Sequence, residues 1–219
     1  MDAAKLVDKD KNYPIAEALG LLEKTSTTKF DATCEIHVQL GIKPEHAEQN
    51  LRMAVDLPAG TGKKVRVAAI VGQSKEKDAK DGGADIIGGE ELVEKISKGF
   101  LDFDIVVATP EMMPKLAKVG KILGTKGLMP NPKTETVTED PKKAIEKLKK
   151  GRVELRNDKF GIVHALFGKV SMGSEALAKN YNAIMEAIKK AKPQGVKGTY
   201  LKKVSVTTTM GPGIRIEME

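Results

Sequence analysis

We expect the chain to form a two-domain protein, with one domain of the α+β class and one of the α/β class. Apolar and polar residues alternate at both ends of the chain, which is typical of antiparallel sheets with one buried face. Short apolar strands alternate with helices in the middle, which favours a parallel sheet covered on both faces. The length of 219 residues also exceeds the roughly 100–150 residues of a usual single domain.

The N-terminal segment predicts a helix, a strand, a short helix and a second strand, over residues 14–24, 29–40, 43–50 and 51–57. The first helix begins with Pro14, whose fixed φ suits the first turn, and its apolar residues recur at helical spacing. The second strand ends where proline and glycine cluster. These elements are typical of an α+β domain.

The strand over residues 29–40 has the clearest pattern in the chain. Its apolar and polar residues alternate, so one face should be buried and the other wet. Alternation assigns Phe30 and Cys34 to the buried face, and Thr33 and Glu35 to the wet face. A buried role suits Cys34, because a lone cysteine in such a strand is more often a small hydrophobe than a nucleophile.

The middle of the chain alternates between apolar strands and amphipathic helices. The predicted strands cover residues 65–71, 84–87 and 104–108, and the predicted helices cover residues 73–80, 90–98, 111–119 and 140–150. This order is typical of a Rossmann-like, three-layer α/β domain. The glycine pairs here match neither GxGxxG nor GxxxxGK[ST], so we expect no nucleotide cofactor.

A predicted loop over residues 124–133 is rich in glycine, proline and lysine. Two interpretations stay open. One is contact with a partner, because loops of this length inside compact domains are often functional. The other is a rigid lid that Leu128 and Met129 hold against the domain.

Wet-face alternation returns at the end of the chain. The predicted elements are strands at residues 153–155, 162–167 and 202–208, a turn at residues 156–159 and a helix at residues 175–190. We expect residues 1–63 and 154–219 to form one α+β domain, with an α/β domain of residues 64–153 inserted between them. The two chain crossings should adjoin, because an insertion leaves and re-enters its host at neighbouring points.

Charge narrows the classes of function. The chain has 37 Lys and Arg against 30 Asp and Glu, a net charge of +7 that favours polyanionic partners. The net charge rises from −2 over residues 1–63 to +4 over residues 64–153 and +5 over residues 154–219, without a basic tail. Any recognition of nucleic acid should therefore use a shaped, folded surface.

Composition also excludes several chemistries. With one cysteine and three histidines, the chain offers no credible zinc site or Cys/His catalytic set, so we predict no metal and no catalytic residues. No stretch approaches the roughly 18 consecutive apolar residues of a membrane span, and residues 1–11 do not resemble a secretion signal. We expect a cytoplasmic protein without membrane contact.

Three short segments suit contact with RNA. Residues 207–212 combine hydroxyls, a flexible thioether and a glycine that lets another backbone approach closely. Residues 29–30 place an aromatic ring beside a cation, and residues 156–159 form a turn with two cations. Structured RNA is recognised through shape, phosphates and 2′-hydroxyls, with occasional base stacking. For Phe30, core packing and base stacking both stay open.

Several short motifs follow one another along nearly the whole chain. They are Lys29-Phe30-Asp31, Gln49-Asn50-Leu51-Arg52, Gly60-Thr61-Gly62-Lys63 before Val65-Arg66-Val67, Gly83-Ala84-Asp85, Phe103-Asp104-Ile105-Val106, Gly127-Leu128-Met129-Pro130-Asn131-Pro132-Lys133, Arg156-Asn157-Asp158-Lys159 and Thr208-Thr209-Met210-Gly211. In this order they resemble the L-one family of bacterial large-subunit ribosomal proteins, which form the mobile stalk beside the tRNA exit site.

The resemblance implies a two-domain fold with an insertion and no enzymatic activity. It implies binding to the stalk region of the large-subunit rRNA, contact with deacylated tRNA at the exit site, and repression of the protein's own mRNA through a similar structure in its leader. We expect a monomer when the protein is free. The RNA-binding residues that the resemblance implies are Lys29, Phe30, Thr33, Glu35, Asp158, Lys159, Gly161, His164, Thr207, Thr209, Met210 and Gly211.

Two other classes of function compete with this interpretation. One is an enzyme that uses the α/β domain on a small phosphorylated substrate, although the sequence offers no paired nucleophile and base. The other is a free-standing translational repressor whose main ligand is mRNA. Sedimentation separates the ribosomal protein, which travels with the large subunit, from the repressor, which stays free. An enzyme should instead be stabilised against heat by a nucleotide.

Overall fold

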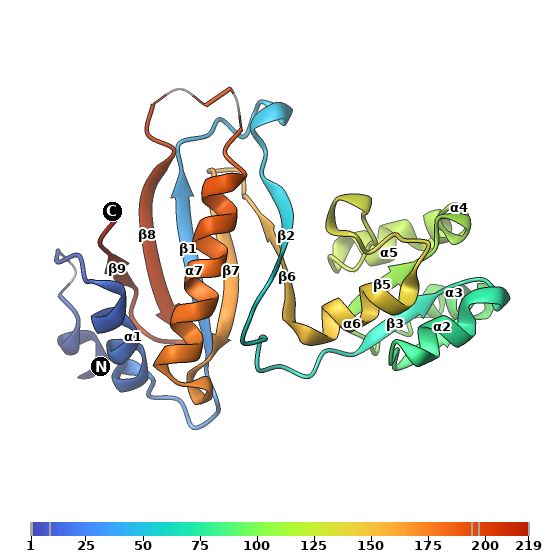
Figure 1. Ribbon diagram of the computed structural model, residues 1–219, viewed down its shortest axis with the longest axis horizontal. Helices are drawn as coiled ribbons and strands as arrows, with labels where there is room; N and C mark the ends of the chain where they lie inside the picture. The colour runs from blue at the N-terminus through green and yellow to red at the C-terminus, as the bar shows by residue number, and fades with distance from the viewer. Residues whose placement is uncertain (1, 9, 194, 197, 219) are drawn as a thin grey trace. The chain divides into compact units, whose positions relative to one another are not determined.

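The computed structural model describes residues 2–8, 10–193, 195–196 and 198–218 (Figure 1). The chain divides into two compact units. The terminal unit combines Met1–Lys63 with Gly151–Glu219, and the inserted unit comprises Lys64–Lys150. Among the described helices, none is long and apolar enough to cross a membrane.

The terminal unit is built on an antiparallel sheet of four strands in the order β7-β1-β8-β9 (Figure 1). The strands are β1 (Thr33–Leu40), β7 (Ile162–Lys169), β8 (Leu201–Thr208) and β9 (Ile214–Ile216). The first strand of the chain therefore lies between two strands from its C-terminal half. In this register His37 lies opposite both His164 and Ser205.

Helices cover one face of this sheet. α1 (Ile15–Thr25) and α7 (Ser174–Lys190) share a core with buried side chains of the sheet, among them Ile36, Phe167 and Val206 (Figure 1). The side chains of β1 alternate between the buried face and the opposite one, as the sequence pattern predicts. The opposite face carries the polar side chains of β1, which are partly or fully exposed.

A second, two-stranded antiparallel sheet lies where the chain leaves and re-enters the terminal unit. It pairs β2 (Arg52–Asp56) with β6 (Arg152–Arg156). The N–H of Leu57 donates to the carbonyl of Gly151 at 3.1 Å, so the two crossings adjoin. Gly151 has a φ of 112°, and a Cβ there would lie 2.5 Å from the Cα of Gly60. Only glycine fits this close approach.

The inserted unit holds a parallel sheet of three strands in the order β4-β3-β5. The strands are β3 (Val67–Ile70), β4 (Ile86–Gly88) and β5 (Ile105–Ala108). The helices are α2 (Glu76–Asp81), α3 (Glu90–Ser97), α4 (Met113–Leu116), α5 (Gly120–Thr125) and α6 (Pro141–Gly151). In both units, short 3₁₀ helices lie before or between these elements, at Asp2–Leu6, Ala47–Gln49, Gln73–Lys75, Pro110–Met112, Ala117–Val119, Pro132–Thr134 and Val170–Met172.

Successive residues of β3 enter two different hydrophobic cores. Ala68 and Ile70 pack with side chains of α3, α4 and α5, whereas Val67 and Ala69 pack with side chains of α2 and α6. A strand buried on both faces reads as a continuous apolar run, which is the pattern that the sequence shows here. The structure therefore confirms the predicted fold class, an antiparallel α+β sheet from both chain ends with a three-layer α/β insertion.

Several predicted boundaries are wrong. The first strand begins at Thr33 rather than at residue 29, because Asp31 turns away to accept hydrogen bonds from Ser171. Residues 43–50 form turns and the 3₁₀ turn Ala47–Gln49 in place of a short helix. Two short elements, α5 and β9, are not predicted by the sequence patterns.

The segment at residues 124–133 is only partly a loop, because α5 extends to Thr125. The N–H of Leu128 donates to the carbonyl of Leu123 at 2.8 Å. Leu128 and Met129 pack against the α3–α5 core of the inserted unit. These contacts match the rigid-lid interpretation.

Candidate nucleic-acid interface

The open face of the terminal unit is the sheet surface opposite α1 and α7. Its central row comes from β1, and cross-strand pairing adds side chains from β7 and β8. The members are Thr33, Glu35, His37, Gln39, His164, Leu166, Lys203, Ser205 and Thr207. Because successive strand residues are about 3.3 Å apart, the β1 row from Thr33 to Gln39 extends over about 20 Å.

A tight turn at residues 208–211 closes one end of the open face. Met210 adopts a left-handed conformation with a φ of 64°, and its side chain is 84% exposed. The turn is tied to β1, because the N–H of Thr209 donates to the Thr33 carbonyl at 3.0 Å. A Cβ on Gly211 would lie 2.2 Å from the Thr208 Oγ1, so a larger residue here would force the turn to shift. The fold therefore holds the thioether out in water.

Two threonine hydroxyls stabilise this turn rather than extending freely outward. The Oγ1 of Thr207 lies 3.1 Å from the Gly211 carbonyl and 3.2 Å from the Pro212 carbonyl. The Oγ1 of Thr209 accepts the N–H of Thr33 at 3.2 Å. The sequence suggests that these hydroxyls donate hydrogen bonds to a partner. The Thr207 hydroxyl proton is already used within the turn, so its oxygen can mainly accept a hydrogen bond from a partner.

The segment before β1 lies at the same end of the open face. Lys29 and Phe30 are both exposed, and the Phe30 ring is 55% exposed. The prediction that Phe30 belongs to the buried face is therefore wrong, because the strand pairing begins only at Thr33. Asp31 anchors the segment by accepting the N–H and hydroxyl of Ser171 at 3.1 and 2.8 Å. These hydrogen bonds, and the nearby Lys169, lower the pKa of Asp31.

A second turn, between β6 and β7, closes the other end. Oδ1 of Asp158 accepts the N–H groups of Phe160 and Ile162, both at 2.8 Å. Partial burial raises the pKa of Asp158, but these backbone donors and His164 outweigh it and lower the pKa overall. Gly161 is buried with a φ of 76°, so it shapes this turn and presents no side chain.

Four titratable side chains form a row across the middle of the open face. The Nδ1 atoms of His37 and His164 are 2.8 Å apart. Glu35 lies 3.9 Å from the Nε2 of His37, and Asp158 lies 3.5 Å from the Nε2 of His164. Burial and His164 lower the pKa of His37, against an opposing effect of Glu35. The row combines carboxylate acceptors with imidazole donors and acceptors, and its net charge is negative.

Exposed cations surround this polar row. Lys29 lies at one end, Lys159 at the other, and Lys203 lies opposite Gln39 in the register. Among the described residues, none of the three forms an ion pair, in contrast to Lys169, which is 3.5 Å from Asp31. Unpaired lysines on one face suit contact with phosphates.

The structure thus places the twelve predicted residues on one face of the terminal unit, in the two turns at its ends or in the segment just before β1. Gly161 lies beneath the surface and acts through the backbone. Lys203, Ser205 and Phe160 also lie on or beside this face, although the sequence patterns do not indicate them. Lys203 and Ser205 are placed there by the strand register, which pairs them with Gln39 and His37. This register cannot be read from a single sequence.

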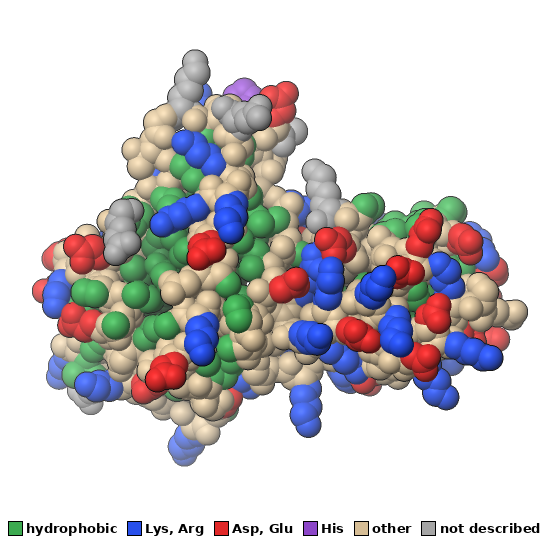
Figure 2. All heavy atoms as spheres, viewed as in Figure 1, with side chains coloured by type: hydrophobic (Ala, Val, Ile, Leu, Met, Phe, Trp, Pro, Cys, Tyr) green, Lys and Arg blue, Asp and Glu red, His purple; other side chains and the backbone are tan. Residues whose placement is uncertain are grey.

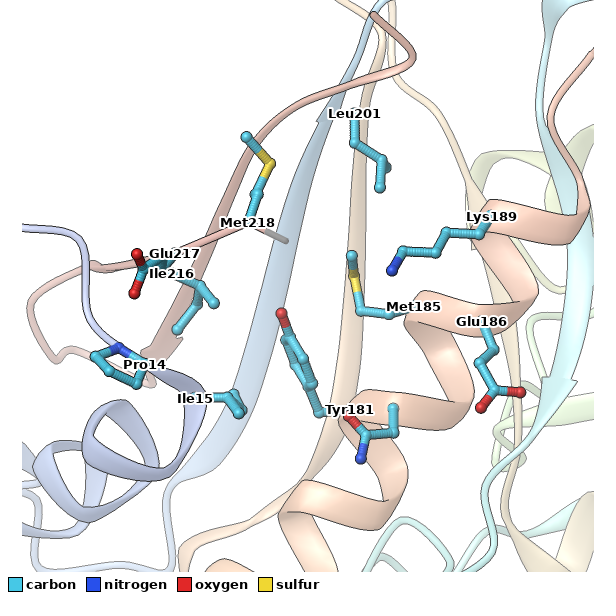
Figure 3. Close-up of a pocket in the computed structure, with 11 residues that line it drawn as sticks. Pro14, Ile15, Tyr181, Met185, Glu186, Lys189, Leu201, Ile216, Glu217 and Met218 are labelled. Atoms are coloured by element: carbon cyan, nitrogen blue, oxygen red, sulfur yellow. The ribbon is translucent and has the colours of Figure 1, made fainter.

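The helix-covered side of the terminal unit has a different character. Figure 2 shows hydrophobic side chains around α7 there, with lysines and carboxylates interspersed. A groove of about 700 Å³ lies between α7, α1 and β9, where Tyr181, Met185 and Met218 surround it (Figure 3). Burial raises the pKa of Tyr181 to about 12, so its hydroxyl does not act as a base. The described lining residues include neither histidine nor cysteine.

Comparison with known proteins identifies the family. Residues 22–212 match the family model described as the Ribosomal protein L1p/L10e family. The chain belongs to this family. It is 52% identical over 217 residues to the large ribosomal subunit protein uL1 of Mycoplasma capricolum subsp. capricolum, which covers 99% of this chain and 96% of that protein.

Two further relatives of the L1p/L10e family carry the same name. The protein of Mesoplasma florum is 52% identical over 214 residues, covering 97% of this chain and 94% of its own length. That of Mycoplasma mycoides subsp. mycoides SC is 52% identical over 217 residues, covering 99% and 96%. Membership in the L1p/L10e family confirms the resemblance seen in the motifs and the prediction of a ribosomal, non-enzymatic protein.

Proposed function

We propose that the protein is a structural rRNA-binding protein of the large ribosomal subunit, in the stalk beside the tRNA exit site. One observation carries the proposal: two anchored turns and a polar strand row converge on the open face of the terminal unit. The name of the relatives, large ribosomal subunit protein, supports the proposed location. Binding thus belongs to the terminal unit.

Lysines supply the affinity and the turns supply the fit. Lys29, Lys159 and Lys203 pair with phosphates, which makes binding weaken as salt rises. The exposed thioether of Met210 packs on a ribose or base, and the adjacent Gly211 allows the RNA backbone to approach. Glu35 accepts hydrogen bonds from a 2′-hydroxyl or a base amine, so the acidic residue contributes selectivity rather than attraction.

A matched pair of substitutions tests this surface. Met210→Asp places a carboxylate in the proposed RNA contact, whereas Met218→Asp places one on the helix-covered side, where Met218 is 43% exposed. In a gel-shift assay with a transcript of the stalk rRNA, we expect Met210→Asp to lose at least about tenfold in affinity and Met218→Asp to retain the parent value. Equal affinity of both variants would remove the Met210 turn from the site.

We further propose that the same surface binds the leader of the protein's own mRNA and represses its translation. The open face is one continuous site, so rRNA and leader should exclude each other. Competition between the two transcripts for the labelled protein tests this. Simultaneous binding of both transcripts would contradict a shared site.

Two finer proposals follow from the family. Contact with deacylated tRNA at the exit site assists its release, so ribosomes reconstituted without the protein should release labelled deacylated tRNA more slowly. The free protein is a monomer, which sedimentation equilibrium tests at micromolar concentration. A tRNA release rate independent of the protein, or a dimeric mass, would contradict the respective proposal.

A further inference from the structure

The five phenylalanines differ sharply in exposure. Phe103 and Phe167 are buried, and Phe100 lies 6.4 Å from the Phe103 ring. Phe30 and Phe160 are 55% and 69% exposed, and both belong to the terminal unit. Single exposed apolar residues are common, so exposure alone does not define a site. The setting of Phe160 does more.

Phe160 is held in a rigid turn. Its N–H donates to Asp158 Oδ1 at 2.8 Å, and the Asp158 N–H donates to the Ile162 carbonyl at 2.8 Å. Asn157 anchors the turn to the segment before β2, because its Oδ1 accepts the N–H of Leu51 at 2.7 Å. These hydrogen bonds fix the backbone of Phe160, and its ring extends into water. A backbone that is already ordered loses little conformational freedom on binding.

A cation lies over one face of this ring. The Nζ of Lys159 is 5.2 Å from the centroid of the Phe160 ring. In the described part of the chain, Lys159 has no acidic partner. An aromatic face with an adjacent ammonium group matches a nucleotide, which carries a base that can stack and a phosphate that can pair.

The turn lies at the edge of the open face. The N–H of Leu40, at the end of β1, donates to the Gly161 carbonyl at 2.9 Å. Asp158 also lies 3.5 Å from His164, which belongs to the open face. Phe160 thus adjoins the open face at the end opposite Met210, whose turn is tied to Thr33.

We propose that Phe160 stacks on a base of the bound RNA and that Lys159 pairs with a phosphate beside the same base. The proposal rests on the proposed function and deepens it, because it adds a residue that neither the motifs nor their family resemblance indicated. RNA suits the surroundings better than a protein partner does, since the ring stands among charged and polar groups rather than in an apolar patch.

Affinity measurements separate stacking from simple apolar contact. Phe160→Leu keeps an apolar side chain and removes the ring, whereas Phe160→Tyr keeps the ring. With a transcript of the stalk rRNA, we expect Phe160→Leu to bind about 5- to 100-fold more weakly and Phe160→Tyr to bind within about twofold of the parent. The dependence on salt should be unchanged in both, because no charge is altered, while Lys159→Ala should reduce the slope by about one.

A fluorescence experiment reports stacking directly. The chain has no tryptophan, so Phe160→Trp introduces a single reporter. We expect the stalk rRNA transcript to quench this tryptophan at the concentration at which it binds. Phe100→Trp, in the inserted unit, is the matched control and should show no quenching.

The outcomes distinguish this inference from the proposed function. Unchanged affinity of Phe160→Leu, or an unquenched Phe160→Trp that still binds, overturns the stacking role while Met210→Asp still loses affinity. If Met210→Asp and Phe160→Leu both bind like the parent, the open face itself is not the RNA site. Quenching together with weaker binding of Phe160→Leu supports the proposal.

Discussion

His37 and His164 face each other across β1 and β7, with their Nδ1 atoms 2.8 Å apart. A hydrogen bond between two such nitrogens requires one of them to accept, so at least one imidazole is neutral. Glu35 and Asp158 lie at the two outer ends of this pair. The pair therefore links folding and proton uptake in the middle of the proposed RNA surface.

We predict that the terminal unit loses stability as the pH falls below about 6.5. Burial, followed by the neighbouring His164, lowers the pKa of His37 in the folded protein. Between the lowered value and the usual one, the unfolded chain binds more protons, so the free energy of unfolding decreases as pH falls. Urea titrations at pH 7.5, 6.5 and 5.5 measure the effect.

The control is His37→Gln, which keeps a polar side chain and removes the titrating group. Its urea midpoint should change less between pH 7.5 and 5.5 than that of the parent protein. A parent midpoint that rises on acidification would show that the sign of the linkage is wrong.

Cys34 should be unreactive in the folded protein. Burial raises the pKa of its thiol to about 12, with further contributions from Asp31, Glu23 and Glu35, and the side chain is fully buried. Because the thiolate is the nucleophile, both effects suppress alkylation. Pulse labelling with a maleimide at one fixed pH should therefore follow the unfolding of the terminal unit in urea. Rapid labelling without urea would contradict the buried position.

Asn180 should stabilise residues 59–60, which lie just before the chain leaves the terminal unit. Its Nδ2 donates to the carbonyls of Gly60 and Phe167, both at 2.8 Å, and its Oδ1 accepts from Ala59 at 3.0 Å. Asn180→Ala removes three hydrogen bonds and leaves the buried carbonyl of Phe167 without this partner, so we expect a loss of about 2–4 kcal/mol in the free energy of unfolding. The exposed Asn182→Ala, on the same helix, should cost less than about 0.5 kcal/mol. Equal losses would show that the buried network is unimportant.

Met210→Gly should separate stability from binding. A residue with a side chain is strained at the left-handed φ of 64°, so glycine should leave stability unchanged or raise it by about 1 kcal/mol. Loss of the thioether should nevertheless weaken binding to the stalk rRNA, while Met210→Leu should retain most of it. Thermal unfolding and gel shifts on the same preparations measure both. Parental affinity of the glycine variant would contradict a contact by this side chain.

Sequence patterns predict the elements that depend on local periodicity. The alternation around Cys34 and Ile36 gave the faces of β1, and the apolar run around Val67 gave a strand buried on both sides. The prediction for Phe30 was wrong because the alternation of apolar and polar residues extends beyond the paired part of the strand. The reason is a long-range contact, from Asp31 to Ser171, that no local pattern encodes.

The site was only partly predictable for the same reason. The exposed Met210 turn follows from its glycine and threonines, whereas the His37–His164 contact depends on a register between strands 127 residues apart. The three-residue strand Ile214–Ile216 is too short for a periodic signal. Phe160 lies in a turn that the sequence marks, but only the structure shows that Asp158 holds its backbone and that its ring is exposed.

Lysine footprinting of the complex with the stalk rRNA tests the central claim most directly. The reagent modifies exposed lysines, and mass spectrometry compares free and bound protein. We predict that RNA protects Lys29, Lys159 and Lys203, on or beside the open face, and leaves Lys179 and Lys189 on α7 reactive. Protection of the α7 lysines with undiminished reactivity of the open-face lysines would contradict the account.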